Sequence, residues 1–143
     1  MAPSDLPESF RCHHLGVAVP EVESAIPLYE RLLGRRLLSG PFDDPIQKVR
    51  VCFLGDGSAG DVVIELIAPL AGADDAPVHQ HLKKGLGAYH ICYEVARMDE
   101  AIADLRKKGC LLVSGPVPAV AFKGKQIAWL LMPTRQLIEL VEV

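Results

Sequence analysis

Two histidines and two glutamates recur at matching places in the two halves of this chain. His14 opens the apolar stretch HLGVAVP, and His90 opens HICYEV in the same way. Each half closes with the tripeptide Ile-Glu-Leu, which contains Glu65 in the first half and Glu139 in the second. Imidazole nitrogens and carboxylate oxygens together suit Zn²⁺, Fe²⁺, Co²⁺, Ni²⁺ or Mn²⁺. The recurrence therefore predicts a divalent metal ion held by these four residues.

The surroundings of the two glutamates support this prediction. Glu65 interrupts the apolar stretch DVVIELIA, and Glu139 interrupts QLIELVEV. A charged carboxylate is rarely buried without a partner, so each of them would be costly in a dry core. Taken singly, a strand glutamate more often faces water and a strand histidine is more often an ordinary core residue. Because both glutamates recur in a repeat, one shared cation is the simpler explanation.

Three other histidines are left outside the predicted site. His13 is expected to point away from His14, because neighbouring side chains in a strand alternate between its faces. His79 and His81 fall on a short expected helix at a spacing that does not place them on one face, so we expect them to be solvated.

Each half reads as a strand, an amphipathic helix and three further strands. The helices are indicated by apolar residues at helical spacing and by Gly34 and Gly109, which follow as stops. Strands are expected where apolar and polar residues alternate or where a short apolar run is bounded by turn residues. In the first half the expected elements are strand 12–19, helix 22–33 and strands 35–39, 48–54 and 61–68, with a loop at 40–45. After a short helix at 77–84, the second half repeats them as strand 89–95, helix 98–105 and strands 110–113, 126–131 and 136–143, with a loop at 114–118.

Composition narrows the classes of function. A formal net charge of −3 gives no sign of a nucleic-acid-binding surface. No apolar run approaches the roughly 18 residues that span a bilayer, and the first residues, MAPSDLPESF, lack the features of a secretory signal. The four cysteines form no Cys-x-x-Cys pair and are expected to be reduced thiols. We therefore expect a cytoplasmic protein with no nucleic-acid or membrane partner.

The chain resembles the vicinal oxygen chelate superfamily (glyoxalase, bleomycin resistance and dioxygenase proteins), and within it the methylmalonyl-CoA epimerases. The resemblance is carried, in order, by HHLGVAVPEVESAIPLYERLLG, VRVCFLGDG, VIELIAPL, HICYEV, GKQIAWL and LIELVEV. It implies an α+β fold in which two tandem βαβββ modules, at about 11–70 and 86–143, form a shared, cupped mixed β-sheet around a metal site. Residues 1–143 would be one vicinal oxygen chelate domain and would pair as a homodimer. The chain departs from the family pattern at Tyr89, where the epimerases usually carry a second histidine.

The same resemblance implies an enzyme. The family's ligand positions fall on His14, Glu65, His90 and Glu139, and the activity would be epimerisation or isomerisation by removal of a proton α to a carbonyl or thioester. Glu139 and Glu65 are the candidate acid–base residues, with Glu139 favoured. The substrate would be a small molecule such as an acyl-CoA. Its anionic tail would meet some of four basic side chains, which could equally be solvated surface charges: Arg50, Lys123, Lys125 and Arg135.

Three alternatives stay open. A glyoxalase I-like lyase would use the same site on a glutathione hemithioacetal. An extradiol dioxygenase is disfavoured, because that chemistry commonly uses two histidines and one carboxylate with iron. A non-catalytic ligand-binding or resistance protein of specialised metabolism is also disfavoured, because such members of the superfamily typically lack the four ligands.

Overall fold

The computed structural model describes residues 9–85 and 87–143. Residue 86, where the second module is expected to begin, and most of the N-terminal segment MAPSDLPESF lie outside the described residues. The helices are α1 (Val22–Leu33), α2 (Pro77–Lys83) and α3 (Met98–Lys107), with a short 3₁₀ turn η2 (Val120–Phe122). The strands are β1 (Arg11–Ala18), β2 (Arg36–Asp44), β3 (Val49–Gly55), β4 (Ile64–Pro69), β5 (Ala88–Val95), β6 (Leu111–Pro118), β7 (Gln126–Leu131) and β8 (Leu137–Glu142).

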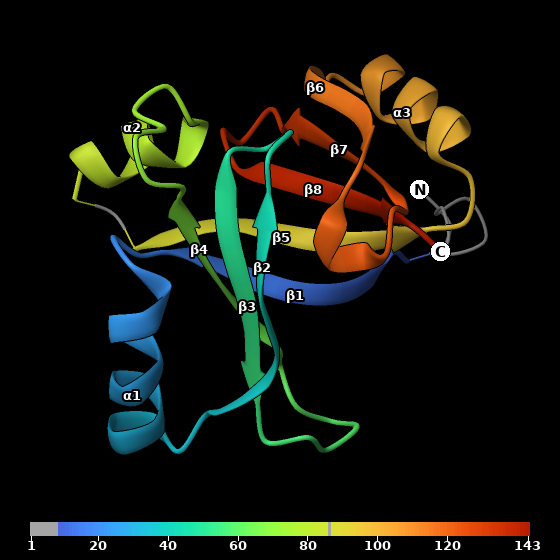
Figure 1. Ribbon diagram of the computed structural model, residues 1–143. Coiled ribbons are helices and arrows are strands. Elements are labelled where there is room, and N and C mark those ends of the chain that lie inside the picture. Colours follow the sequence, from blue (N-terminus) through green and yellow to red (C-terminus); the bar gives the residue numbers. More distant parts are fainter. Residues whose placement is uncertain (1–8, 86) are drawn as a thin grey trace.

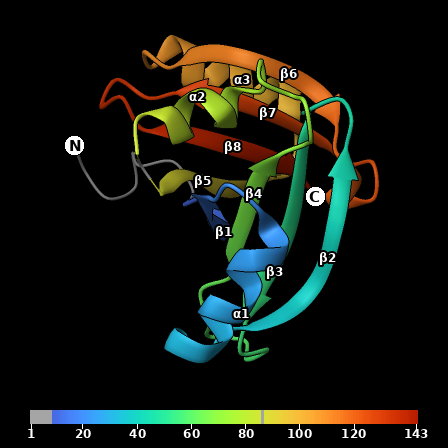
Figure 2. The same ribbon diagram turned by 60° about the vertical axis from the view of Figure 1, so that its left-hand side comes forward.

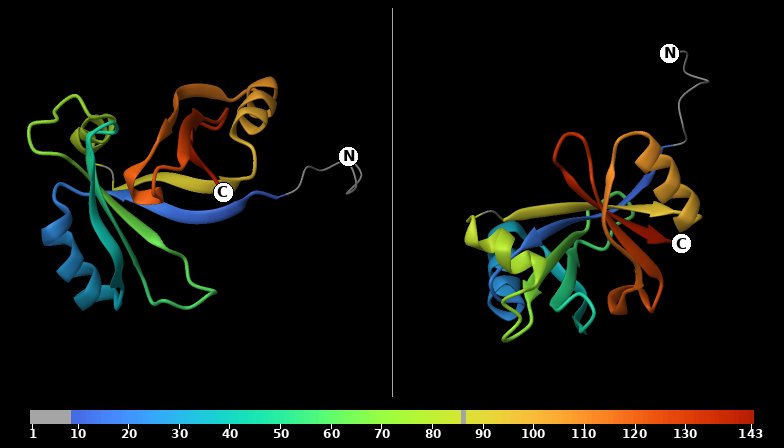
Figure 3. Two further views of the ribbon diagram at one scale, coloured as in Figure 1. Left: turned by 45° about the vertical axis from the view of Figure 1, so that its right-hand side comes forward. Right: turned by 90° about the horizontal axis from the view of Figure 1, so that it is seen from above.

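All eight of these strands form one sheet in the order β2-β3-β4-β1-β5-β8-β7-β6. Each module contributes four adjacent strands, and the modules meet where β1 pairs with β5 in antiparallel orientation. The pairs β1–β4 and β5–β8 are parallel, so the sheet is mixed. The sheet is strongly curled, so one of its faces is concave (Figures 1 and 3). The predicted α+β fold with two βαβββ modules and a shared, cupped mixed sheet is therefore confirmed.

Helices α1 and α3 cover the convex face of the sheet, one on each module (Figure 2). Strand residues alternate between faces, so Cys52 and Leu54 of β3 pack under α1, whereas Val51 on the same strand faces inward. In the second module Leu130 packs under α3 and Trp129 faces inward. The outer helices thus leave the concave face of the sheet free for a site. Within the described part of the chain, no helix is long and apolar enough to cross a membrane.

Two loops expected from the sequence are strands in the structure. Residues 40–44 continue β2, with Pro45 in the turn that follows, and residues 114–118 continue β6. Each of these strands contains Ser-Gly-Pro, at residues 39–41 and 114–116, and its pairing with the next strand shifts in register there. The glycines take φ values of 94° and 92°, which favour glycine. The loop predictions were wrong because Gly-Pro reads as a turn signal, whereas here it marks a β-bulge within an edge strand.

Candidate metal centre

The four predicted ligand residues come together at the centre of the sheet. His14, Glu65, His90 and Glu139 lie on β1, β4, β5 and β8, which are the four central strands. One ligand atom from each residue lies within 4.8 Å of the ligand atoms of the others. Residues distant in the sequence are therefore positioned by the meeting of the two modules.

The distances within this cluster match those expected around one small cation. His14 Nε2 lies 3.5 Å from Glu65 Oε1 and 3.3 Å from Glu139 Oε1. His90 Nε2 lies 3.3 Å and 3.4 Å from the same two oxygens, and the two Nε2 atoms are 3.0 Å apart. Two ligand atoms about 2.1 Å from a common ion lie roughly 3.0 Å apart at a right angle and roughly 3.4 Å apart at the tetrahedral angle. The four side chains thus fit a divalent metal of the N/O-binding class.

Burial gives a second test of this fit. His14, Glu65, His90 and Glu139 are 0%, 4%, 1% and 3% exposed. Among the described residues, no contact of Glu139 Oε1 has the geometry of a hydrogen bond, although Nε2 of His14 and of His90 lie 3.3 and 3.4 Å from it. A buried carboxylate oxygen without a donor is costly, and a cation shared by both carboxylates would compensate it. The unpaired carboxylate oxygen and the set of two nitrogen and two oxygen ligand atoms therefore both favour a bound cation.

Glycine makes room for His90. Gly16 of β1 lies opposite both Glu65 of β4 and His90 of β5 in the sheet register. A Cβ atom at Gly16 would stand 2.1 Å from Cε1 and 2.6 Å from Nε2 of the His90 ring. Since these distances are far below van der Waals contact, the absence of a side chain at Gly16 is what lets the imidazole lie over β1 and reach the cluster.

The cluster perturbs the titration of its own members. Burial lowers the pKa of His14, but Glu65 and Glu139 outweigh burial and raise the pKa to about 10. Burial likewise lowers the pKa of His90, and the same two carboxylates outweigh it, so this pKa is also raised. Burial raises the pKa of each glutamate, yet the imidazoles hold both below the usual range. At neutral pH these side chains alone form imidazolium–carboxylate pairs, whose protons an incoming metal must displace.

His13 lies beside the cluster, so the prediction that it points away from His14 was wrong. Its Nδ1 lies 2.9 Å from Nδ1 of His14, and the two rings meet edge to face. The pairing of β1 with β5 shifts in register between Cys12 and His14, which breaks the strict alternation of side chains. Burial and the neighbouring His14 lower the pKa of His13, so its ring stays neutral and can accept a hydrogen bond from His14. Such a partner fixes the tautomer and orientation of a ligating histidine.

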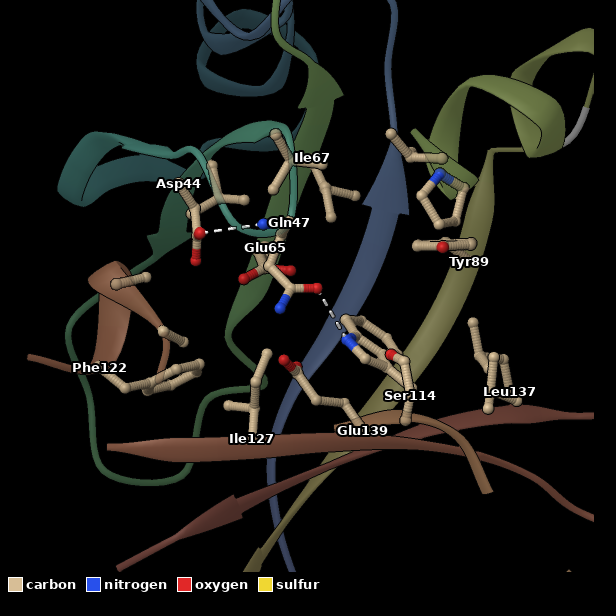
Figure 4. A pocket seen from close by; sticks show the side chains of 18 residues that line it. Asp44, Gln47, Glu65, Ile67, Tyr89, Ser114, Phe122, Ile127, Leu137 and Glu139 are labelled. Carbon is tan, nitrogen blue, oxygen red and sulfur yellow. Dashed lines mark hydrogen bonds between the residues drawn. The ribbon is translucent and has the colours of Figure 1, made fainter. Parts of the chain in front are cut away.

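A largely apolar pocket opens on the carboxylate side of the cluster (Figure 4). Glu65 and Glu139 line it, whereas His14 and His90 do not contribute to its walls. The remaining walls come chiefly from β3, β4, β7, α2 and η2, and include Val49, Val51, Ile67, Val78, Phe122, Ile127 and Trp129. A bound molecule would therefore meet two carboxylates at the floor of an otherwise apolar space, as small-molecule sites commonly arrange their few polar groups.

Besides Ser114, two further polar residues of the pocket were missed by the sequence reasoning. Asp44 and Gln47 lie at the turn between β2 and β3 and line the same pocket. The residues around them were read only as a turn-rich loop and the start of a strand. The alternation that places Val49 and Val51 on the inward face extends back to position 47, and this signal could have identified Gln47.

The four candidate basic side chains lie away from the pocket lining. Arg50 is bound on the outer surface by Asp43 and Glu23, with Arg50 Nε 2.6 Å from Asp43 Oδ1. Lys123, Lys125 and Arg135 are exposed and do not line the pocket.

The two helix histidines are less exposed than the sequence suggested. His79 and His81 of α2 are both half-buried, which corrects their expected solvation. Nε2 of His81 lies 2.7 Å from the carbonyl oxygen of Ala88 at the start of β5. His81 therefore connects the short helix to the strand that carries His90, and neither helix histidine joins the metal cluster.

The chain is also similar in sequence to known proteins of one superfamily. Residues 13–129 match the model of the Glyoxalase/Bleomycin resistance protein/Dioxygenase superfamily. An ethylmalonyl-CoA/methylmalonyl-CoA epimerase of Cereibacter sphaeroides is 31% identical over 122 residues, which cover 84% of this chain and 87% of that protein. The mitochondrial methylmalonyl-CoA epimerase of Homo sapiens is 33% identical over 122 residues, again 84% of this chain but only 65% of that protein.

Solved structures of methylmalonyl-CoA epimerases are similar to this chain as well. A variant of the methylmalonyl-CoA epimerase of Streptomyces coelicolor, in complex with 2-nitronate-propionyl-CoA, superposes with a TM-score of 0.76 at 26% identity. The superposition covers 94% of this chain and 98% of that one. The similarity therefore extends over nearly the whole fold.

Proposed function

Because the chain belongs to the glyoxalase/bleomycin resistance protein/dioxygenase superfamily, we propose that it is a metal-dependent epimerase or isomerase. The reaction would remove and return a proton on the carbon α to a carbonyl or thioester. The observation that carries this proposal is the buried set of two imidazoles and two carboxylates, with its carboxylates facing an apolar pocket. The epimerase relatives favour this chemistry among the activities of the superfamily.

In this proposal His14, Glu65, His90 and Glu139 hold the metal. When bound, the metal would supply positive charge against the negative charge that develops as the α-proton leaves. His13 would keep the His14 ring in the orientation that presents Nε2 to the cluster. The apolar walls would exclude water, which strengthens electrostatic interactions within the pocket.

The glutamates are the proposed acid–base pair. Epimerisation requires removal of a proton on one face of a carbon and its return on the other. Glu65 and Glu139 come from opposite modules and both line the pocket, so a substrate carbon between them could exchange a proton with each. Glu139 is proposed as the main base of the two, and the separate alanine variants below test this choice.

An acyl-CoA is the proposed substrate class. The support is the Streptomyces coelicolor relative, whose structure holds an acyl-CoA analogue, together with the apolar walls that would accept an acyl chain. The homodimer, the cytoplasmic location and the single domain over residues 1–143 stay predictions. Sedimentation velocity of the purified protein would test the first of them.

The decisive experiment is exchange of the α-proton of methylmalonyl-CoA in deuterium oxide, followed by mass spectrometry. We expect exchange that disappears on chelation and returns when the metal is restored. Glu139→Ala and Glu65→Ala should each abolish exchange, whereas the control Asp74→Ala, which removes a carboxylate at an exposed position, should not. Full activity of Glu139→Ala would refute its role. Turnover of a glutathione hemithioacetal without exchange of methylmalonyl-CoA would favour a glyoxalase-type lyase instead.

A further inference from the structure

We propose that Gln47 binds a substrate oxygen through its side-chain amide and so selects substrates with an oxygen acceptor beside the reacting carbon. The inference rests on the proposed function, because it assigns a recognition residue to the same substrate. Gln47 shares the pocket with Glu65 and Glu139, yet it takes no part in the predicted metal set. Three features of its surroundings lead to this assignment.

The backbone of Gln47 is held in place by a buried carboxylate. Oδ1 of Asp44 accepts hydrogen bonds from the backbone N–H groups of Ile46 and Gln47, each at 3.0 Å. Oδ2 of Asp44 accepts from the backbone N–H of Val120 in η2, at 3.3 Å. Asp44 is 4% exposed, so these bonds lie largely out of water. The turn that carries Gln47 is therefore tied to the second module across the pocket.

Trp129 fixes which way the amide of Gln47 faces. Nε1 of Trp129 donates a hydrogen bond of 3.1 Å to Oε1 of Gln47. An indole N–H can only donate, so the amide must turn its oxygen toward Trp129 and its NH₂ group away. Figure 4 shows the amide nitrogen directed into the part of the pocket bounded by Glu65 and Glu139. Its N–H groups are thus presented where the substrate would react.

The amide N–H groups have no acceptor of their own among the described residues, since none of the hydrogen bonds there is donated by Nε2 of Gln47. The pocket walls also include Val49, Ile67 and Ile127, whose side chains offer no acceptor, and the carboxylates of Glu65 and Glu139 are assigned to the metal in the proposed function. A polar donor in such surroundings gains from a ligand that brings an acceptor. Carbonyl and carboxylate oxygens are the acceptors that an activated acyl substrate carries.

Two replacements of Gln47 test the hydrogen-bond donor separately from the size of the side chain. Gln47→Met keeps the length of the side chain without a donor. Gln47→Glu keeps its shape and can still accept from Trp129, but presents a carboxylate to the substrate. Gln80→Glu, the same chemical change at an exposed position of α2, is the matched control. Metal content should be unchanged in Gln47→Met and Gln80→Glu, because neither position belongs to the metal set. The thermal midpoint should fall in Gln47→Met, because Nε1 of Trp129 loses its acceptor, and should stay unchanged in Gln80→Glu.

Binding can be followed apart from turnover. Trp129 is the single tryptophan of the chain and touches Gln47, so its fluorescence reports on the pocket. Titration with methylmalonyl-CoA should give a Kd that is weaker by about 10- to 100-fold in both Gln47 variants, as expected for loss of a hydrogen bond to a charged oxygen. Propionyl-CoA, which lacks the free carboxylate, distinguishes the two acceptors. A smaller loss with propionyl-CoA assigns Gln47 to the carboxylate, and an equal loss assigns it to the thioester oxygen.

The outcomes separate this inference from the proposed reaction. If the wild type binds methylmalonyl-CoA in a Gln47-dependent way but exchanges no proton, the reaction is wrong and the role of Gln47 stands. If Gln47→Met binds as tightly as the wild type, the role of Gln47 is refuted, whether or not exchange occurs. No binding to the wild type would overturn both.

Discussion

Replacing Gly16 with alanine should remove His90 from the metal set. The added Cβ would lie 2.1 Å from Cε1, 2.3 Å from Nδ1 and 2.6 Å from Nε2 of the imidazole. Carbon atoms in contact need about 3.5 Å, so the ring or the strand must move by more than 1 Å, on the order of 1.4 Å at Cε1. Metal sites tolerate displacements of only about 0.2 Å in their ligand distances. His90 therefore cannot keep its place beside the alanine.

The expected loss of metal affinity follows from this displacement. Disturbing a hydrogen-bonding partner of a ligand typically costs about 10- to 100-fold in metal affinity. Because Gly16→Ala displaces a ligand itself, we expect a loss at or above the upper end, about 100-fold or more. Competition with a chromophoric chelator would measure the affinity for Zn²⁺ or Co²⁺. Gly60→Ala is the matched control, since a Cβ there would meet nothing within 4 Å.

A double variant tests whether the effect acts through His90. In a His90→Ala background the imidazole is absent, so Gly16→Ala should cost no further affinity, and the two changes should be strongly non-additive. The double variant also relieves the clash, and circular dichroism would show that it folds. Wild-type affinity in Gly16→Ala, or additive losses in the double variant, would refute the reasoning.

Four further predictions concern the groups around the cluster and the pocket. His13→Ala should weaken metal affinity by about 10- to 100-fold, measured by the same competition, whereas His79→Ala on α2 should not. Since the pKa of His14 is raised to about 10, metal binding at pH 8 should release protons, and calorimetry in buffers of different ionisation enthalpy would detect them. Without metal, the stability that this raised pKa contributes should be complete below about pH 6.5 and disappear as the pH rises toward 10, as urea unfolding across that range would show. Asp44→Ala should lower the free energy of unfolding by about 2 kcal/mol, because buried N–H groups lose a charged acceptor, while Asp74→Ala should leave it unchanged.

Much of the fold was accessible from sequence, because the apolar periodicities coincide with the elements. Helix α1 begins and ends where the pattern Val22–Leu33 and the stop at Gly34 predicted. The expected strand from residue 61 instead begins at Ile64, and Asp61 forms a bidentate ion pair with Arg35. Long-range pairs of this kind leave no trace in a local pattern. The repeated Ser-Gly-Pro was visible but was interpreted as two loops.

Site residues could likewise be predicted where the sequence repeat marks them, but not where their position depends on the pairing of distant strands. His14, Glu65, His90 and Glu139 could be selected together because duplication repeats them at equivalent positions of the two modules. His13 could not be placed, because the register shift that turns it toward His14 belongs to the pairing of β1 with β5. That pairing joins segments far apart in the chain, and no periodicity of β1 alone records it.

The cluster of four proposed metal ligands follows the pseudo-symmetry of the two modules, and the pocket departs from it. Each module supplies one histidine and one glutamate from its central strands, so duplication of a single unit accounts for the ligands. The turn between β2 and β3 brings Asp44 and Gln47 to the pocket, whereas between β6 and β7 the corresponding segment forms η2 and brings Phe122. Such asymmetry has a physical consequence, because a substrate with two different ends can bind in one orientation only if the two sides of the pocket differ. If Gln47 binds the free carboxylate, the wild type should prefer methylmalonyl-CoA over propionyl-CoA. Exchanging the polar and aromatic sides, with Gln47→Phe and Phe122→Gln together, should then keep the metal and lose that preference. Retention of that preference would show that orientation is set by the metal ligands alone.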